Sequence, residues 1–278
     1  SSSRMVQNMN KRFFPLALVA LATLASGAAF AAEAPKEIVV ASGNSSVPNT
    51  YISKGTHMGT EPDIWAVIAQ KTGLKVDFVT GEFNTLFGYL DSGRAETVGN
   101  TITINQKRIE KYNFSEPYAY IPEKLVVQEE RTDLKRLKDI SGLRCGYSSG
   151  SNGGNLFKQI AEKEGIEVEL VVFDSSDLLN EAFRQKKIDV MIFAGSEAAF
   201  KIKNGFLKAR TVEENIAIGE KAYPFRKGDE KSQALRQLVT KAIQEMKADG
   251  SLKAIYEKWF GEDYSQPPAG YVSPWQLQ

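Results

Sequence analysis

Residues 86–96 and 179–189 carry the same pattern, although they lie far apart in the chain. Each segment has two apolar residues four positions apart, as in Leu86 and Leu90, then a basic turn, then an acidic residue before a short apolar run. This order is typical of an amphipathic helix, a turn and a buried strand. Chance recurrence of a common helix–strand unit would give the same pattern. The alternative is a chain of two similar α/β lobes, with a ligand bound between them at the carboxyl ends of the strands.

The rest of the chain shows the same alternation of strands and helices. Runs of β-branched residues predict strands over 38–41, 75–79, 143–147, 167–173 and 188–193. Helical periodicity of apolar residues predicts helices over 62–71, 156–164, 233–247 and 252–259. Strands that alternate with helices favour parallel sheets covered by helices, which is the α/β fold class.

The N-terminal segment has the features of a secretory signal peptide. Residues 9–12 give a basic start, and an uncharged stretch follows over 13–32. Small residues at Ala29 and Ala31 are typical of a cleavage site, so we expect cleavage near Ala31. A transmembrane anchor is the alternative, but the stretch is rich in alanine and is interrupted by Pro15. We therefore expect a soluble, exported protein.

The composition excludes several kinds of site. The chain has one cysteine, Cys145, and one histidine, His57. A disulfide within the chain, an iron–sulfur cluster and a metal site built on several cysteines or histidines are therefore excluded. Lys+Arg 35 against Asp+Glu 34 gives a net charge of +1, which does not indicate a nucleic-acid partner. We expect no cofactor and no metal, a core position for Cys145 and a surface loop for His57.

Two loops could recognise an anion. In 99–104, small hydroxyl and amide residues beside a glycine leave backbone N–H groups accessible, and Arg108 follows. An arginine at such a place can hold a carboxylate through two parallel hydrogen bonds. The Gly/Ser-rich loop 146–154 leads into a predicted helix, whose N-terminus favours anions. Plain turn chemistry explains either loop as well. Neither matches a nucleotide-binding motif.

Segment 96–108, together with segment 112–118, resembles the signature of the periplasmic polar amino-acid-binding proteins. These are the soluble receptors of ABC importers, family 3 of the bacterial solute-binding proteins. The resemblance extends over nearly the whole chain after the signal peptide, through motifs at 59–63, 83–93, 137–146, 150–152 and 249–261. In segments 99–103, 111–115, 223–225 and 258–263, the amino-acid sequence is most similar to that of the cystine-binding branch of the family.

The resemblance implies a two-lobed periplasmic-binding-protein fold of type II. Each lobe would be a mixed, mainly parallel sheet covered by helices, and two hinge strands would join the lobes. Residues 1–31 would be an N-terminal extension and signal peptide, residues 33–127 plus 212–278 lobe 1, and residues 128–211 lobe 2. The implied function is a periplasmic receptor, monomeric and not an enzyme. It would bind a polar amino acid, with cystine the best single guess, and deliver it to a membrane-embedded ABC permease.

The resemblance also implies a ligand site. Arg108 would pair with the α-carboxylate of the ligand, and Phe83 would stack on the ligand side chain. The groups that assist Arg108 would come from two loops: Thr103, Asn100, Thr101, Ser151 and Asn152.

This chain departs from the family at the ammonium site. The family usually has an acid at the end of a lobe 2 strand, and that position is Ala194 here. Near the first strand, where the family often has an acid and an aromatic residue, the chain has Gly43 and Ser46. An ammonium group buried without a counter-charge is strongly unfavourable. Either the ligand is not an ordinary α-amino acid, or a nearby acid replaces the missing one: Glu197 first, then Asp174 and Asp177.

Two other functions remain open on the sequence. The fold resemblance extends to a periplasmic cyclohexadienyl dehydratase, which acts on prephenate or arogenate. The missing ammonium acid and Glu197 as a general acid fit that reading. The chain has no Cys–His pair and only one histidine, which argues against nucleophilic catalysis. A sensor that uses the fold without transport is the third possibility.

Overall fold

The computed structural model describes residues 33–149 and 151–275. The chain divides into an N-terminal unit, Ser1–Glu33, and a compact unit, Ala34–Gln278, and the fold described below is that of the second unit. The signal peptide expected over 1–31 lies outside the described residues. In the described part of the chain, no helix has both the length and the apolar character needed to cross a membrane.

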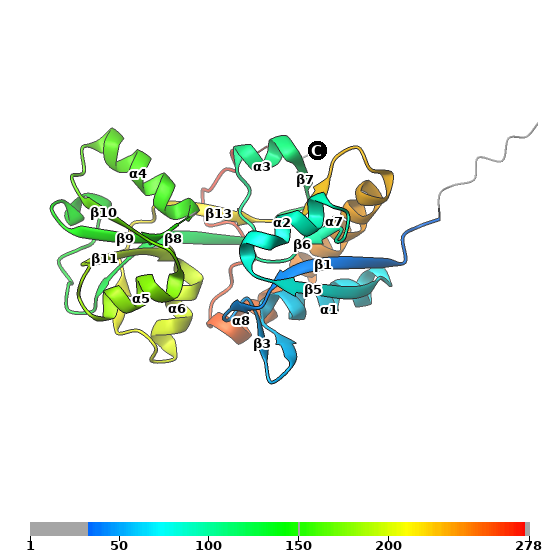
Figure 1. The fold of residues 1–278 in the computed structure, drawn as a ribbon, viewed down its shortest axis with the longest axis horizontal. Coiled ribbons are helices and arrows are strands. Elements are labelled where there is room, and N and C mark those ends of the chain that lie inside the picture. The colour runs from blue at the N-terminus through cyan, green and yellow to red at the C-terminus, as the bar shows by residue number, and fades with distance from the viewer. Residues whose placement is uncertain (1–32, 150, 276–278) are drawn as a thin grey trace, which may run out of the picture. The chain divides into compact units, whose positions relative to one another are not determined.

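Two main sheets organise this unit (Figure 1). The smaller consists, in order, of the parallel strands β5 (Lys75–Gly81), β1 (Glu37–Gly43) and β6 (Thr97–Val98). The larger consists, in order, of β10 (Glu169–Phe173), β9 (Arg144–Ser148), β11 (Val190–Ala194), β8 (Ala119–Gln128) and β12 (Ala209–Thr211), and β13 (Ala217–Lys221) also pairs with β8. Strand β8 is antiparallel to its three partners, whereas β10, β9 and β11 are parallel. The five strands predicted from the sequence correspond to β1, β5, β9, β10 and β11.

The two sheets repeat one local arrangement. Helix α2 (Phe83–Asp91) precedes β6, which pairs in parallel with β1. In the same way, helix α5 (Ser176–Arg184) precedes β11, which pairs in parallel with β9. Both helices bury the apolar residues of the repeated sequence pattern: Leu86, Leu90, Leu179 and Phe183. The prediction of two similar α/β units is therefore confirmed.

The helices cover the predicted segments and extend beyond them. The four predicted helices are α1 (Thr60–Thr72), α4 (Asn152–Glu164), α7 (Glu230–Asp249) and α8 (Ser251–Phe260). Helix α7 begins earlier than predicted because the Asp229 carboxylate accepts from the backbone N–H groups of Lys231, at 3.1 Å, and Ser232, at 3.3 Å. The remaining helices are α3 (Gln106–Lys111), α6 (Gly195–Lys203) and a short 3-10 helix, Leu137–Ile140.

Two small sheets complete the fold. One is the pair β14 (Pro224–Arg226) and β7 (Tyr112–Phe114), and the other contains β2 (Ser45–Ser46), β3 (Thr50–Ser53) and β4 (Thr56–Met58). Cys145 is fully buried in β9, and burial raises the pKa of its thiol to about 12. The predicted core position of Cys145 is confirmed.

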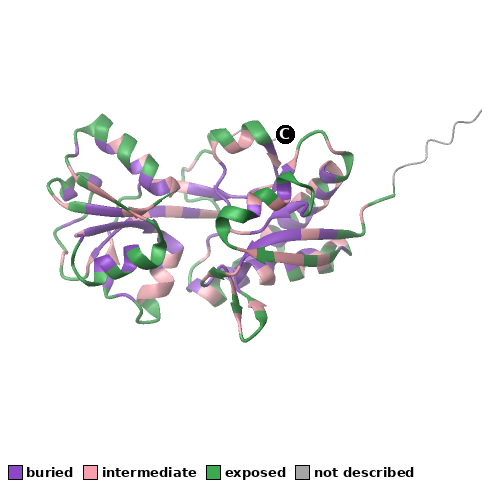
Figure 2. Cartoon of the chain, in the orientation of Figure 1, coloured by how far each residue is buried: buried purple, intermediate pink, exposed green. Residues whose placement is uncertain are grey.

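Strand β8 passes from one hydrophobic core to another. Its residues Ala119 and Ile121 pack in a core with helices α1, α7 and α8, whereas Leu125 and Val127 pack in a second core with α4. Figure 2 shows buried residues along β8 in both halves. Strand β13 runs antiparallel beside the first half of β8. These two strands are therefore the hinge strands of a two-lobed fold.

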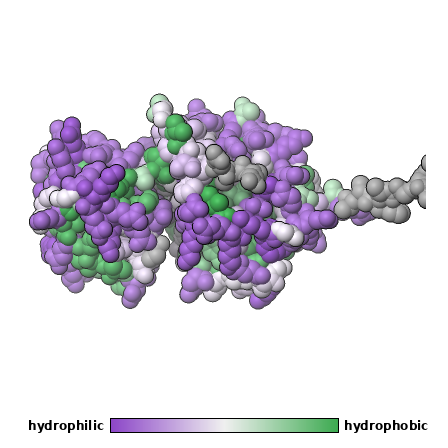
Figure 3. All heavy atoms as spheres, turned by 90° about the horizontal axis from the view of Figure 1, so that it is seen from above, coloured by the Kyte–Doolittle hydropathy of each residue, from purple (hydrophilic) through white to green (hydrophobic). Residues whose placement is uncertain are grey.

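The lobe boundaries at residues 127/128 and 211/212 stay predictions. The surface seen in Figure 3 is mostly hydrophilic, with apolar residues in scattered groups.

Candidate functional site

The loop 99–103 lies beyond the carboxyl ends of the smaller sheet and is held there by side chains. The Asn100 carboxamide oxygen accepts a hydrogen bond from the backbone N–H of Gly43, at 2.9 Å. The backbone N–H of Thr101 donates to the Glu61 carboxylate at 3.0 Å, and Thr101 adopts a left-handed φ of 56°. The side chain of Asn100 therefore positions the loop against the end of β1.

Arg108 lies next to this loop, in α3. Helix α3 begins there because the Asn105 side chain caps it, accepting from the Arg108 N–H at 2.8 Å. One guanidinium nitrogen, Nη1, donates to the Thr103 carbonyl at 2.7 Å, and the guanidinium lies 5.3 Å from the centre of the Phe87 ring. Among the described residues nothing hydrogen-bonds to Nε or Nη2 of Arg108, so this cation retains donors for a ligand carboxylate.

Phe83 stands at the start of α2, and 51% of its surface is exposed. Its ring meets that of Phe87 edge-on, with 6.4 Å between the centroids. Because Phe87 also contacts Arg108, the two predicted ligand residues Phe83 and Arg108 both contact one aromatic ring. An exposed phenyl ring beside a carboxylate-binding arginine can stack on a ligand side chain.

Lys221, at the end of β13, adds a second cation to the same place. Its ammonium donates to Oγ1 of Thr103 at 2.6 Å, and only 5% of the residue is exposed. The side chain runs over Gly219, where a Cβ would lie 3.4 Å from Nζ. Burial lowers the pKa of Lys221, and the charges of Glu123 and Glu197 act in the opposite direction. Thr103 therefore joins the two cations of the site, through its carbonyl and its hydroxyl.

Glu123 faces this cation from β8. The residue is 6% exposed, and its register partner in β11 is Ala194. A Cβ on Gly153, in the first turn of α4, would lie 2.6 Å from Oε2 of Glu123. Burial raises the pKa of Glu123, and the charge of Lys221 lowers it. The Glu123 carboxylate is thus enclosed between the start of α4 and the hinge strands.

The predicted residues Ser151 and Asn152 lie at that start of α4. The Ser151 hydroxyl oxygen caps the helix by accepting from the Gly154 N–H at 3.1 Å, and Asn152 is the first helical residue. The Ser151 oxygen is therefore used by the helix. Gly153, which follows Asn152, brings this turn into contact with Glu123.

Glu197 lies in the first turn of α6 and is partly exposed. Its Oε1 accepts from the Asn49 amide at 3.1 Å, which links α6 to the segment before β3. Burial raises the pKa of Glu197; the charges of Lys201 and Lys221 lower it, and that of Glu123 raises it further. Glu197 therefore belongs to the same electrostatic neighbourhood as Lys221.

Asp174 and Asp177 are the other acids that could replace the missing ammonium-binding acid. Both are exposed: Asp174 lies just before α5 and Asp177 in its first turn. Among the described residues, neither Asp174 nor Asp177 interacts with Arg108, Lys221 or Glu197.

The structure thus assembles a charged cluster of five residues: Thr103, Arg108, Glu123, Glu197 and Lys221. Sequence reasoning found Thr103, Arg108 and Glu197 but missed Glu123 and Lys221. The only signal for the two missed residues was a charge within an apolar stretch, because no periodic pattern marked β8 or β13 as strands.

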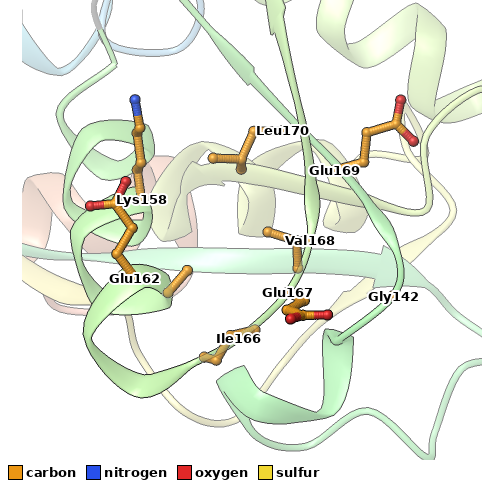
Figure 4. A pocket seen from close by; sticks show the side chains of 9 residues that line it. Gly142, Lys158, Glu162, Ile166, Glu167, Val168, Glu169 and Leu170 are labelled. Atoms are coloured by element: carbon orange, nitrogen blue, oxygen red, sulfur yellow. The ribbon is translucent and has the colours of Figure 1, made fainter.

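A shallow hollow elsewhere on the larger sheet contains none of the predicted site residues. It lies between α4 and β10 and is lined by Gly142, Lys158, Ala161, Glu162, Ile166, Glu167, Val168, Glu169 and Leu170 (Figure 4). Three of these residues are glutamates, and one is a lysine, so the hollow presents mixed charges rather than the paired donors of the charged cluster.

His57 was expected in a surface loop, and that prediction is wrong. It lies in β4, partly buried, with Nε2 at 2.7 Å from the Thr50 hydroxyl and its ring edge-on to Phe78 at 4.6 Å. Thr50 donates to the Gly43 carbonyl at 2.7 Å. The histidine is therefore a structural residue that supports the end of β1.

Comparisons with known proteins agree with this arrangement. The profile of the bacterial extracellular solute-binding proteins, family 3, matches residues 38–144 and 149–262. The chain is 28% identical to the probable amino-acid-binding protein YxeM of Bacillus subtilis over 246 residues, which is 88% of this chain and 92% of YxeM. It is 31% identical to the L-cystine-binding protein TcyA of Bacillus subtilis over 227 residues, 79% of each chain.

A solved structure gives the same result for the fold. An ancestral arginine-binding protein bound to arginine superposes with a TM-score of 0.68 and 27% identity, covering 82% of this chain and 100% of that one. The profile match, the relatives and the two sheets joined by β8 and β13 all indicate one family. The chain belongs to the bacterial extracellular solute-binding proteins of family 3, and its fold is the two-lobed type II fold of the amino-acid-binding members.

Proposed function

We propose that this protein is a periplasmic receptor that binds a polar amino acid between its lobes and delivers it to a membrane-embedded ABC permease. The observation that carries this proposal is the charged cluster at the hinge strands, with two cations and two acids around Thr103. An amino acid presents one carboxylate and one ammonium group, so a site with both signs of charge is complementary to it.

The carboxylate of the ligand is proposed to bind to Arg108. The unused Nε and Nη2 donors of Arg108 point to a two-bond contact, because a guanidinium and a carboxylate match in shape. Thr103 supports this contact by fixing Nη1, and the backbone N–H of Asn152, at the start of α4, would complete it from lobe 2. The backbone N–H of Ser151, in contrast, donates to the Ser148 carbonyl at 3.0 Å. Phe83 would stack on the ligand side chain from lobe 1, and Asn100 and Thr101 would shape the loop.

This arrangement provides a reason for closure. Arg108 follows the smaller sheet, whereas the start of α4 follows β9 of the larger sheet. A ligand that contacts both lobes binds the closed form more tightly than the open form, and therefore shifts the equilibrium toward closure. The closed form is then the state that a permease recognises.

Cystine is the proposed ligand to test first. TcyA, named as an L-cystine-binding protein, is 31% identical to this chain. The sequence motifs around Thr103 and Trp259 also resemble those of the cystine-binding branch of the family. The ancestral arginine-binding protein is named for a different amino acid at 27% identity, so the ligand has to be measured directly.

Binding without turnover is proposed over the dehydratase activity. The matched relatives YxeM and TcyA are named as binding proteins. A raised pKa at Glu197 suits a general acid, but its carboxylate is engaged by the Asn49 amide. A binding role needs no group that gives up a proton, and the charged cluster fulfils it as it stands.

The test is a binding screen on protein purified from the periplasm and refolded once from denaturant to remove bound ligand. Calorimetry would measure the binding of L-cystine, the twenty amino acids and prephenate. Absorbance would measure whether prephenate is consumed. We expect saturable binding of one or a few amino acids and no loss of prephenate. Binding of prephenate with its consumption, and no response to any amino acid, would overturn the proposal in favour of the enzyme.

A further inference from the structure

We propose that Glu123, on hinge strand β8, is the group that binds the α-ammonium of the ligand. This inference rests on the proposed function, because it assumes an amino-acid ligand whose carboxylate binds to Arg108. It departs from the sequence prediction, which named Glu197 first among the acids that could take that role.

The first argument comes from the sheet register. Glu123 pairs with Ala194 of β11 on one side and with Ala217 of β13 on the other. Residues directly opposite each other in antiparallel strands project from the same face of a sheet, about 5 Å apart. The long acidic side chain therefore stands between two methyl groups. These small neighbours do not cover its carboxylate from the adjacent strands, and the group that lies against it is Gly153 at the start of α4.

The register also shows which residue can replace the acid that the family usually has at position 194. A side chain at position 194 would emerge beside that of Glu123, on the same face of the sheet. A glutamate on the neighbouring strand can therefore bring a carboxylate to the space that an acid at 194 would occupy. Sequence proximity to Ala194 suggested Glu197, but the nearest acid across the sheet is Glu123.

The second argument is the lack of a hydrogen-bond donor. Glu123 is 6% exposed, yet among the described residues no hydrogen bond reaches either of its carboxylate oxygens. A buried carboxylate in this condition is unfavourable unless a charged partner satisfies it. Lys221 supplies charge, but its ammonium donates to Thr103. Glu197 differs, because the Asn49 amide already donates to its carboxylate.

The third argument is the balance of charges. Within the cluster, Arg108 and Lys221 are the cations and Glu123 and Glu197 the acids, and Lys201 of α6 adds a further positive charge that acts on Glu197. A zwitterionic amino acid adds no net charge to such a site. A ligand with only a carboxylate, or only an amine, would leave one buried charge without a partner. The cluster therefore favours ligands that carry both a carboxylate and an ammonium group.

The decisive experiment compares an amino acid with its analogue that has hydrogen in place of each amino group. The probes are L-cystine and its deaminated analogue 3,3′-dithiodipropionate. If the screen selects another amino acid, that amino acid and its own deaminated analogue are used instead. We expect Glu123→Gln to weaken binding of the amino acid about 10- to 100-fold, the effect of removing one charged hydrogen bond. Binding of the deaminated analogue should not change.

Matched variants separate the outcomes. Glu129→Gln, an exposed acid just after β8, is the control for a general charge effect. Ala194→Asp, added to Glu123→Gln, should restore most of the lost affinity, because it returns a carboxylate to the same face. Glu123→Asp keeps the charge but shortens the side chain. It should reduce affinity for the amino acid alone, and it replaces Glu123→Gln if that variant does not fold.

Three results would overturn the inference. One is an unchanged affinity of Glu123→Gln for the amino acid. Another is an equal loss of affinity for both probes, which would mark Glu123 as a structural residue. The third is a selective loss in Glu197→Gln without one in Glu123→Gln, which would return the role to Glu197. Failure of the proposed function is distinct, because the wild-type protein would then bind no amino acid at all.

Discussion

The Glu61 carboxylate accepts a hydrogen bond from the hydroxyl of Tyr223, 2.7 Å away, in a fully buried position. Its other oxygen accepts from the Tyr118 hydroxyl and from the Thr101 N–H. Tyr118 immediately precedes β8, Tyr223 follows β13, and Thr101 belongs to the loop 99–103. A single carboxylate therefore holds the loop and one end of both hinge strands together.

Replacing Glu61 should destabilise the protein strongly. In Glu61→Ala, two buried hydroxyl groups and the partly buried Thr101 N–H lose their acceptor, which costs about 3 kcal/mol in the free energy of unfolding. Tyr223→Phe removes one of these bonds and should cost about 1 kcal/mol. Urea denaturation of both variants checks that the free energy of unfolding falls more in Glu61→Ala than in Tyr223→Phe. A Glu61→Ala variant as stable as the wild type would contradict the interpretation of Glu61 as the joint of the loop and the hinge.

Arg108→Ala should abolish ligand binding and leave the fold intact. The variant loses the guanidinium proposed to hold the carboxylate, so we expect affinity to fall about 100-fold or more. Lys107→Ala, an exposed neighbour in the same helix, is the matched control. Titration calorimetry measures binding, and circular dichroism checks the fold. Undiminished affinity in Arg108→Ala would show that the site lies elsewhere.

Gly153→Ala should separate binding from stability. Alanine at this helical position normally stabilises a helix by about 1 kcal/mol relative to glycine. Here its Cβ would lie 2.6 Å from Oε2 of Glu123, so the carboxylate must move. We expect affinity for the amino acid to fall several-fold while thermal stability changes little. Gly88→Ala in α2, where a Cβ meets open space, is the control and should leave affinity unchanged.

The stability of the protein should fall at acidic pH through His57. Burial lowers the pKa of its imidazole below the ordinary value of 6.5, because the folded protein favours the neutral ring. The unfolded chain then binds more protons than the folded chain just below pH 6.5. The stabilising contribution is complete above that pH and is lost as the pH falls below it.

Urea denaturation between pH 5 and pH 8 tests this dependence. In His57→Gln, the part of the slope due to His57, at most about 1.4 kcal/mol per pH unit, should disappear. The same slope in wild type and variant would assign the pH dependence to the carboxylates instead.

The sequence predicted the elements whose evidence is local. The repeated pattern at 86–96 and 179–189 corresponds to α2 with β6 and α5 with β11, because amphipathic periodicity is a property of neighbouring residues. The motif that ends at Arg108 identified the family, and the loop and the arginine are held together by short-range bonds to Thr103 and Asn105. These parts needed no knowledge of how distant strands pair.

The tertiary structure alone decided the rest of the site. Charged residues interrupt the apolar patterns of β8 and β13, so neither hinge strand was predicted from periodicity. Lys221 meets Thr103, and Glu123 stands opposite Ala194, only because strands distant in sequence pair in one register. Pairing of distant strands depends on the packing of the whole lobe, and a sequence read along its length contains no local signal for it.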